Sequence, residues 1–386
     1  MNHPIDPMEL KLAMENVHRA GMPGVFGEVR DGEEVWRGAA GVADIRTGDP
    51  VTPDMRHRVG SINKTFTAAA VLQQVEGGAI GLDTPIYHYL PRLMPEERGN
   101  TITVRMLINH TSGLADYLPY AYPSLAAFPS LKDTTPQSLD DNRFTRFYKA
   151  DLIELGVRAP AVSKPGSTPG IYSNTNYLIL CQLIELVTGI TAEQYITQHV
   201  IERAGLHDTE LPSGPQIDGP HSLMYESWFG MIDPPRDYSV FDMSWVGPAA
   251  SLISTVADLN RFYSLLLAGE IVNASSLAQM QRTVPVISFD GKKIEYGLGL
   301  HRMEIPGHGT FWGHDGTVWG AGALTMTRAD GKRQISVAVN LIRWNRLDSS
   351  GKPQNHPIDD ALTALYRLAM CGSKDISGKD SGVPRS

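Results

Sequence analysis

Strand-like sequence is concentrated near the two ends of this chain, and that distribution is the strongest constraint on its fold. Residues 24–44 read as a hairpin around an Asp-Gly turn. Residues 294–342 alternate between apolar and small or polar residues, with an Ala-Asp-Gly turn among them. Residues 79–250 are instead rich in proline and loops, with helical segments between. We therefore expect one sheet built from both ends of the chain, with the middle as a mainly helical insertion.

Helical patterns flank both strand regions. Residues 6–21 are amphipathic and end at a glycine, and residues 356–372 form a second helical pattern, so we expect these helices to cover the sheet. The chain has 386 residues, enough for two or three domains at about 100–200 residues each. The predicted division is a sheet-containing α/β domain of residues 1–76 and 251–372, a mainly helical domain of residues 77–250, and a flexible tail of residues 373–386.

Composition narrows the classes of partner. Hydrophobic residues make up 42% and charged residues 20%, which is typical of a soluble protein with a core. A net charge of -8 gives no general attraction for nucleic acid or an anionic membrane, and no stretch approaches 18 apolar residues. The N-terminus lacks the features of a secretory signal, so we expect a cytoplasmic protein, or a secreted one if a signal was trimmed. Cys181 reads as a packed thiol, and a bridge to Cys371 stays open.

Ser61 and Lys64 open a segment that contains no Gly or Pro up to residue 76 and is apolar on every side in its middle. Residues three apart share a helix face, so the two side chains should be neighbours at its first turn. The serine is either an N-cap or a nucleophile whose proton is taken by a lysine that burial has made neutral. A phosphate-binding loop is excluded, because Asn63 stands where that loop needs glycine.

Two further polar motifs could form an active site together with Ser61 and Lys64. Tyr172 and Asn174 lie in a Pro/Gly-bounded loop before a helix, where side chains can face a cleft. The tyrosine is either a packed aromatic or a phenol that moves protons, and the asparagine is either a cap or a hydrogen-bonding partner. His314-Asp315-Gly316 opens a strand-like segment. The sequence has no His-x-x-x-His or Cys-x-x-Cys partner for this pair, so we predict no metal and no cofactor.

The segments SINK, YSN and HDG, which begin at Ser61, Tyr172 and His314, resemble three ordered motifs of the serine penicillin-recognising superfamily. The chain is most similar to the branch with class C β-lactamases, the Streptomyces-type D-alanyl-D-alanine carboxypeptidase and related esterases. The resemblance covers about residues 20–370. It implies an α/β fold, an α+β sandwich in which an antiparallel sheet carries helices on both faces, plus a mainly helical inserted domain.

The resemblance also implies catalytic roles for the matching residues. Ser61 would be the acylated nucleophile. Lys64 and Tyr172 would activate it and return the proton to the leaving group. Asn174 would orient Lys64 and the substrate amide, and His314 would support Tyr172.

Other matching positions would bind the substrate. The backbone N–H groups of Ser61 and Thr317 would form an oxyanion hole, where losing one donor typically costs about 10²–10³ in rate. Gly316 would let a ligand lie close to the strand backbone. Trp245 matches an aromatic residue at the edge of the cleft, and His110 looks like a structural turn residue.

Two substrate-binding positions depart from the carboxypeptidase pattern. In these enzymes an arginine and a threonine together hold the terminal carboxylate of the substrate. Here His301 stands in place of the arginine and Asp315 in place of the threonine. A guanidinium has been lost and a carboxylate gained, which disfavours substrates with a free carboxylate. We therefore expect an acyl donor or acceptor that is neutral or cationic where the carboxylate would lie: an ester, an amide or an amine. The loop 115–150 contains several aromatic residues and is expected to line the entrance.

Three functions fit these observations. The first is a serine acyl-enzyme hydrolase or transacylase that takes a small-molecule acyl donor and, for transfer, an amine acceptor. The second is a D-alanyl-D-alanine carboxypeptidase or β-lactamase whose signal was removed. The third is a binder that stays acylated or a dead scaffold, and the intact Ser61, Lys64 and Tyr172 argue against the dead scaffold. A hydrolase and a transacylase can share the same catalytic residues, so the sequence leaves both open, as it does the oligomeric state.

Overall fold

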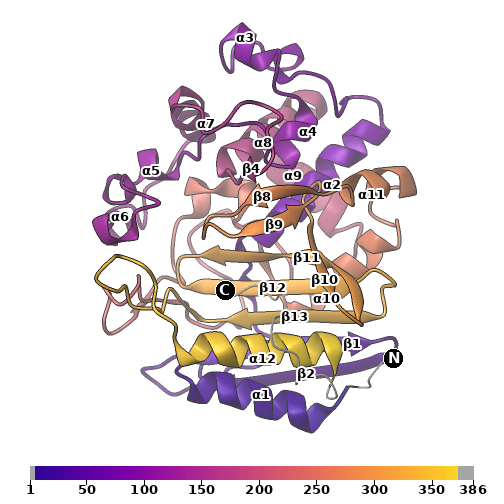
Figure 1. Ribbon diagram of the computed structural model, residues 1–386. Helices are drawn as coiled ribbons and strands as arrows, with labels where there is room; N and C mark the ends of the chain where they lie inside the picture. Colours follow the sequence, from indigo (N-terminus) through magenta and orange to yellow (C-terminus); the bar gives the residue numbers. More distant parts are fainter. Residues whose placement is uncertain (1–4, 373–386) are drawn as a thin grey trace.

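The computed structural model describes residues 5–372 and is built around a nine-stranded sheet (Figure 1). Its strands are β1 (Gly24–Asp31), β2 (Glu34–Gly41), β4 (Gly170–Ile171), β8 (Val284–Ile287), β9 (Lys293–Tyr296), β10 (His301–Ile305), β11 (Gly309–Val318), β12 (Ala321–Arg328) and β13 (Arg333–Val339). The strand order is β2-β1-β13-β12-β11-β10-β9-β8-β4. The N-terminal hairpin therefore lies against the last long strand, with Val25 opposite Val339, which confirms a sheet built from both ends.

The sheet is antiparallel except at one edge. Strand β4 comes from the middle of the chain and runs parallel to β8, an addition that the sequence did not indicate. Five short strands form two smaller sheets: β3 (His57–Arg58), β5 (Tyr225–Glu226), β6 (Arg236–Asp237), β7 (Ile253–Ser254) and β14 (Leu341–Ile342). The pairing of β3 with β7 joins the chain just before Ser61 to the segment that returns from the helical region.

Helices cover both faces of the sheet, as the resemblance implied (Figure 1). They are α1 (Pro7–Arg19), α2 (Asn63–Glu76), α3 (Glu96–Gly99), α4 (Val104–Ile108), α5 (Leu118–Ala121), α6 (Gln137–Asp141), α7 (Lys149–Arg158), α8 (Asn174–Thr188), α9 (Ala192–Ile196), α10 (Val256–Leu267), α11 (Ala274–Met280) and α12 (Pro357–Cys371). Helices α1 and α12 pack side by side on one face, where Val25 belongs to their core. Phe26, the next residue of β1, packs with Val256 of α10 on the other face, as the alternation of a strand requires.

The largest hydrophobic core links the sheet to the helical region. Every residue of α2 from Asn63 to Leu72 is buried, and this helix packs against α8. The same core takes in Val318 and Ala321 at the β11–β12 turn. The division into a sheet-containing domain and a helical domain at residues 76/77 and 250/251 therefore stays a proposal. The predicted flexible tail, residues 373–386, lies outside the described residues.

Helix α8 is a buried core helix that contains Cys181, and no disulfide joins it to Cys371 in α12. Within residues 5–372, no single helix is both long and apolar enough to cross a membrane. One pair, Asn174–Thr188 with Ala192–Ile201, meets that criterion only together, and it is bent by 81°.

Candidate active site

Ser61 lies in a short 3₁₀ turn, η1 (Gly60–Ile62), which leads into α2. This turn packs against β11. Gly60 has a φ of +55°, which favours glycine. A Cβ added at Gly60 would lie 2.5 Å from the backbone nitrogen of Thr317, and one added at Gly316 would lie 2.5 Å from that of Ser61. Two glycines thus bring together the two backbone amides that the resemblance assigned to an oxyanion hole.

Ser61 is not a helix cap. No side chain caps η1 or α2, and the residues at their N-cap positions are Val59 and Ile62. The half-buried Ser61 hydroxyl instead accepts a hydrogen bond from Lys64 Nζ at 2.9 Å. The structure therefore rules out the N-cap interpretation and leaves the nucleophile interpretation.

Lys64 is completely buried inside the first turn of α2. Its Nζ donates to Asn174 Oδ1 at 2.8 Å and to the carbonyl of Ala249 at 3.0 Å, in addition to Ser61. Burial lowers the pKa of Lys64 from 10.5 to about 7, against the opposite effect of Asp116 and Asp315. A large part of the population is thus neutral at neutral pH. The neutral amine keeps two hydrogens, enough for Asn174 and Ala249, and its lone pair can then accept from the Ser61 hydroxyl.

Tyr172 lies at the end of the short strand β4, just before α8, and its ring centroid is 5.0 Å from Lys64 Nζ. Its hydroxyl is buried and has no hydrogen-bond partner among the described residues. Burial raises the pKa of Tyr172 well above its usual range, and the neighbouring Ser61 hydroxyl acts in the opposite direction. The phenol is therefore protonated at neutral pH and close enough to Ser61 to influence it.

His110, which the sequence suggested only as a turn residue, holds the Tyr172 ring in place. It has a φ of +61°, and its ring stacks on that of Tyr172 at a centroid distance of 4.0 Å. Its Nδ1 accepts hydrogen bonds from the Ser173 backbone and the Asn176 side chain, both at 3.2 Å. Burial lowers the pKa of His110 well below its usual range, so the ring is neutral and its orientation is fixed.

Asp116 is a residue of the site that the sequence did not single out. Its carboxylate accepts from the backbone N–H of Asn174 at 2.5 Å and from that of Leu118 at 2.8 Å. It thereby fixes the start of α8, where Asn174 faces Lys64, and its charge opposes the effect of burial on the Lys64 amine. The one available signal was a carboxylate in an otherwise apolar stretch, residues 114–119.

His314, which the resemblance expected to support Tyr172, is hydrogen-bonded to two other groups. Its Nδ1 donates to the backbone carbonyl of Asp315 at 2.5 Å, and its Nε2 accepts from the Tyr296 hydroxyl at 3.0 Å. The Tyr296 ring lies 6.0 Å from that of Tyr172, edge to face. Burial lowers the pKa of His314 well below its usual range. His314 is therefore neutral, and any support for Tyr172 passes through the Tyr296 ring.

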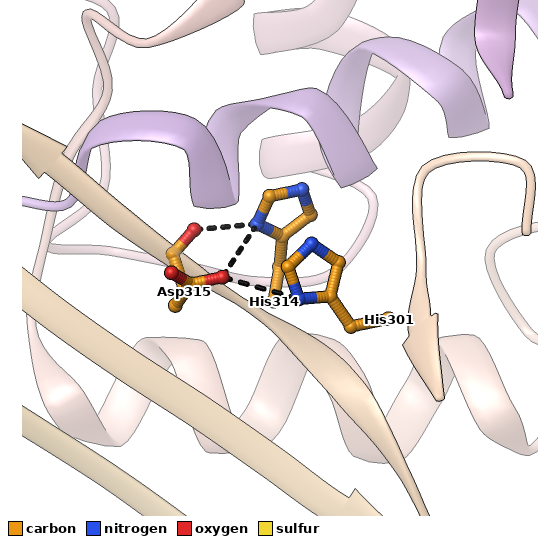
Figure 2. A group of neighbouring side chains, drawn as sticks. All are labelled: His301, His314 and Asp315. Carbon is orange, nitrogen blue, oxygen red and sulfur yellow. Dashed lines mark hydrogen bonds and ion pairs between the residues drawn. The ribbon is translucent and has the colours of Figure 1, made fainter. Parts of the chain in front are cut away.

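His301 and Asp315, the two departures from the carboxypeptidase pattern, are in contact (Figure 2). His301 Nδ1 lies 3.1 Å from Asp315 Oδ1, and the His301 ring packs against that of His314 at 4.1 Å. The imidazoles are buried, whereas the Asp315 side chain is 47% exposed. A carboxylate therefore reaches solvent directly beside the Gly316-Thr317 segment that packs on Ser61.

Trp245 is buried in an aromatic cluster rather than open at a cleft edge. It is 4% exposed and stacks on Trp319 at 4.8 Å. Tyr122 of the loop 115–150 packs against both rings. That loop contains short helices, and its Phe128 reaches Phe289, whose ring lies 5.2 Å from Tyr172. The loop therefore approaches the site, although much of its aromatic surface is committed to packing.

Comparisons with known proteins agree with this geometry. A family model described as Beta-lactamase matches residues 11–358. The chain belongs to the Beta-lactamase family. This confirms the resemblance to the serine penicillin-recognising superfamily and the mixed sheet-and-helix fold that it implied.

The chain is similar to an amidohydrolase, an aminopeptidase and a penicillin-binding protein. The solved structure of a D-stereospecific amidohydrolase from Streptomyces sp. is 30% identical, with a TM-score of 0.79, covering 96% of this chain and all of that one. A D-aminopeptidase of Cereibacter sphaeroides is 26% identical over 85% of this chain and 58% of its own length. Penicillin-binding protein 4 of Amycolatopsis lactamdurans is 26% identical, covering 79% of this chain and 80% of that protein. This member of the Beta-lactamase family thus spans less than two thirds of the D-aminopeptidase.

Proposed function

We propose that this protein is a serine amidohydrolase that works through an acyl-enzyme. The observation that carries the proposal is the buried Lys64 amine, with a pKa of about 7, 2.9 Å from the Ser61 hydroxyl. A serine hydroxyl is a weak nucleophile unless a nearby base takes its proton. A partly neutral lysine in hydrogen-bond contact supplies that base.

The proposed reaction has two stages, acylation and deacylation of Ser61, and Lys64 acts as the base in both. Lys64 takes the proton of Ser61 as its oxygen attacks the amide carbonyl, and the resulting oxyanion is stabilised by the N–H groups of Ser61 and Thr317. The tetrahedral intermediate collapses when the C–N bond breaks and the leaving amine receives the proton, relayed from Lys64 with the help of the Tyr172 phenol. Water then attacks the ester on Ser61, Lys64 takes its proton, and the acid is released while Ser61 regains a hydrogen.

For the substrate, we propose an amide or ester of an amino acid whose own amine is free. The half-exposed Asp315 carboxylate beside the reaction centre favours a cation and repels a carboxylate. The names of the D-stereospecific amidohydrolase and the D-aminopeptidase, to which this chain is similar, support an amino-acid derivative of D configuration. The small-molecule acyl donor expected from the sequence would then be a D-amino acid amide.

The test is a matched set of substrates: the amides of D- and L-phenylalanine and the N-acetyl form of each. We expect the free D-amide to have the highest kcat/KM. A hydrogen bond to a charged group typically contributes about 1.5–3 kcal/mol, so Asp315→Asn should lower kcat/KM for the free amide by at least about tenfold and leave the N-acetyl amide nearly unchanged. Equal losses on both would contradict the assignment of Asp315, and no turnover of any amide or ester would contradict the proposed activity.

The second candidate is D-alanyl-D-alanine carboxypeptidase or β-lactamase activity, favoured by the similarity to penicillin-binding protein 4. Acyl-D-Ala-D-Ala and nitrocefin should be turned over more slowly than the amides, because both carry a carboxylate. A wide margin in their favour would instead select this candidate. Adding a free amine as acceptor, with products identified by mass, decides between hydrolysis and acyl transfer.

A further inference from the structure

Three potential metal ligands converge at the mouth of the candidate active site (Figure 2). His301, His314 and Asp315 each offer a ligand atom, and these atoms all lie within 4.8 Å of one another. The Nδ1 atoms of the two imidazoles face the same carboxylate oxygen, at 3.1 Å for His301 and 3.9 Å for His314. Ligands of a tetrahedral zinc, at about 2.0–2.2 Å from the metal, lie roughly 3.3 Å apart. The His301–Asp315 distance already matches this spacing, whereas the His314 nitrogen must leave the Asp315 carbonyl and move closer to the carboxylate.

The hydrogen bonds of His314 also allow its Nδ1 to bind a metal. His314 Nδ1 at present donates to the Asp315 carbonyl. If its proton moves to Nε2, that nitrogen can donate to the Tyr296 hydroxyl at 3.0 Å. The Tyr296 hydroxyl can then donate to Tyr177, 3.3 Å away, so the exchange leaves His314 neutral.

We propose that His301, His314 and Asp315 form a Zn²⁺ site, with a fourth position open to solvent on the side where Asp315 is exposed. Two imidazoles and one carboxylate with an open position form a ligand set that zinc accepts, and the Tyr296 hydroxyl would act as the outer partner that orients His314. Bound zinc would neutralise Asp315. If Asp315 binds the substrate ammonium, which rests on the function proposed above, zinc would compete with the substrate and inhibit the enzyme.

Zinc binding is measured directly on the metal-stripped full chain by calorimetric titration, with Co²⁺ absorption as a second readout of the ligand geometry. We expect one Zn²⁺ per chain. Changing an outer partner of a metal site typically weakens binding about 10–100-fold, so His301→Gln, Asp315→Asn and Tyr296→Phe should each weaken it at least about tenfold. His207→Gln, which removes an exposed imidazole elsewhere, is the matched control and should bind zinc as the wild type does. Thermal melting of each variant checks that it is folded.

Absence of stoichiometric zinc binding, or equal affinity in the wild type, His301→Gln and Asp315→Asn, would overturn the site. These titrations contain no substrate, so their outcome is independent of whether the protein hydrolyses amides. In a separate assay, zinc should raise KM for the free D-amide and leave the N-acetyl amide nearly unaffected. Zinc that binds at the site without changing KM would overturn the competition.

Discussion

The buried amine of Lys64 should make the stability of the folded protein depend on pH in a way that one substitution removes. In Lys64→Met, a side chain of similar length carries no titratable group. The variant also loses the hydrogen bonds to Ser61, Asn174 and Ala249, which shifts its stability by an amount that does not vary with pH. The difference in unfolding free energy between the two proteins, followed against pH, therefore isolates the protonation of Lys64.

The sign and size follow from the two pKa values. Burial lowers the pKa of Lys64 to about 7 in the folded protein, from 10.5 for an exposed lysine. Between these values the unfolded chain binds the proton more strongly than the folded one, so the unfolding free energy rises with pH, by up to about 1.4 kcal/mol per pH unit. From about pH 6 to about pH 9, wild type should gain about 3 kcal/mol of stability relative to Lys64→Met. Below pH 7 the penalty for burying the amine is fully present.

Urea unfolding of both proteins at a series of pH values measures this difference. Lys11→Met, at an exposed lysine on α1, controls for the loss of a lysine as such and should run parallel to wild type. Parallel curves for wild type and Lys64→Met would refute the reasoning, because they would mean that Lys64 keeps its proton in the folded protein. Lys64 could not then be the base that activates Ser61.

Three further outcomes are expected. The kcat/KM for a neutral ester should rise with pH and level off above a pKa of about 7, as Lys64 loses its proton; a flat profile from pH 5 to 9 would count against the neutral base. Tyr172→Phe should lower kcat by about 10²–10⁴, the usual contribution of a proton-transfer group. It should cost little stability, because the hydroxyl has no hydrogen-bond partner among the described residues. A variant with full activity would exclude the phenol from proton transfer. Gly60→Ala places a Cβ 2.5 Å from the Thr317 backbone nitrogen and should therefore lose activity. Gly78 has a similar φ but no neighbour within 4 Å of an added Cβ, so Gly78→Ala is the control and should stay active. Equal activity of the two variants would mean that the close approach of Gly60 to Thr317 is not needed.

The sequence was most informative where chemistry follows from local geometry. The spacing of Ser61 and Lys64 on a helix with apolar surroundings predicted both their contact and the neutral lysine, and the structure bears out the arrangement. The two-ended sheet was predictable because strand alternation and helical periodicity are local patterns. The short edge strand β4 could not be foreseen, since its two residues take their conformation from pairing with β8.

The remaining site residues depend on contacts between distant segments. His301 and Asp315 become diagonal neighbours because His301 stands opposite Gly313 in the β10–β11 pair, and that register is fixed by the turn between the strands. The contact between the His301 and His314 rings was not predicted for the same reason, since a search for closely spaced ligands overlooks residues that a hairpin brings together. His110 supports Tyr172 from a loop, through a stacking contact that leaves no periodic signal in the sequence.

The most direct test of nucleophilic catalysis is intact-mass spectrometry during turnover of a slow ester or reaction with a fluorophosphonate. We predict one adduct per chain, located on the peptide that contains Ser61, lost with time in the case of the ester and absent from Ser61→Ala. Failure to form an adduct, an adduct on another residue, or ester hydrolysis by Ser61→Ala at the wild-type rate would contradict the account.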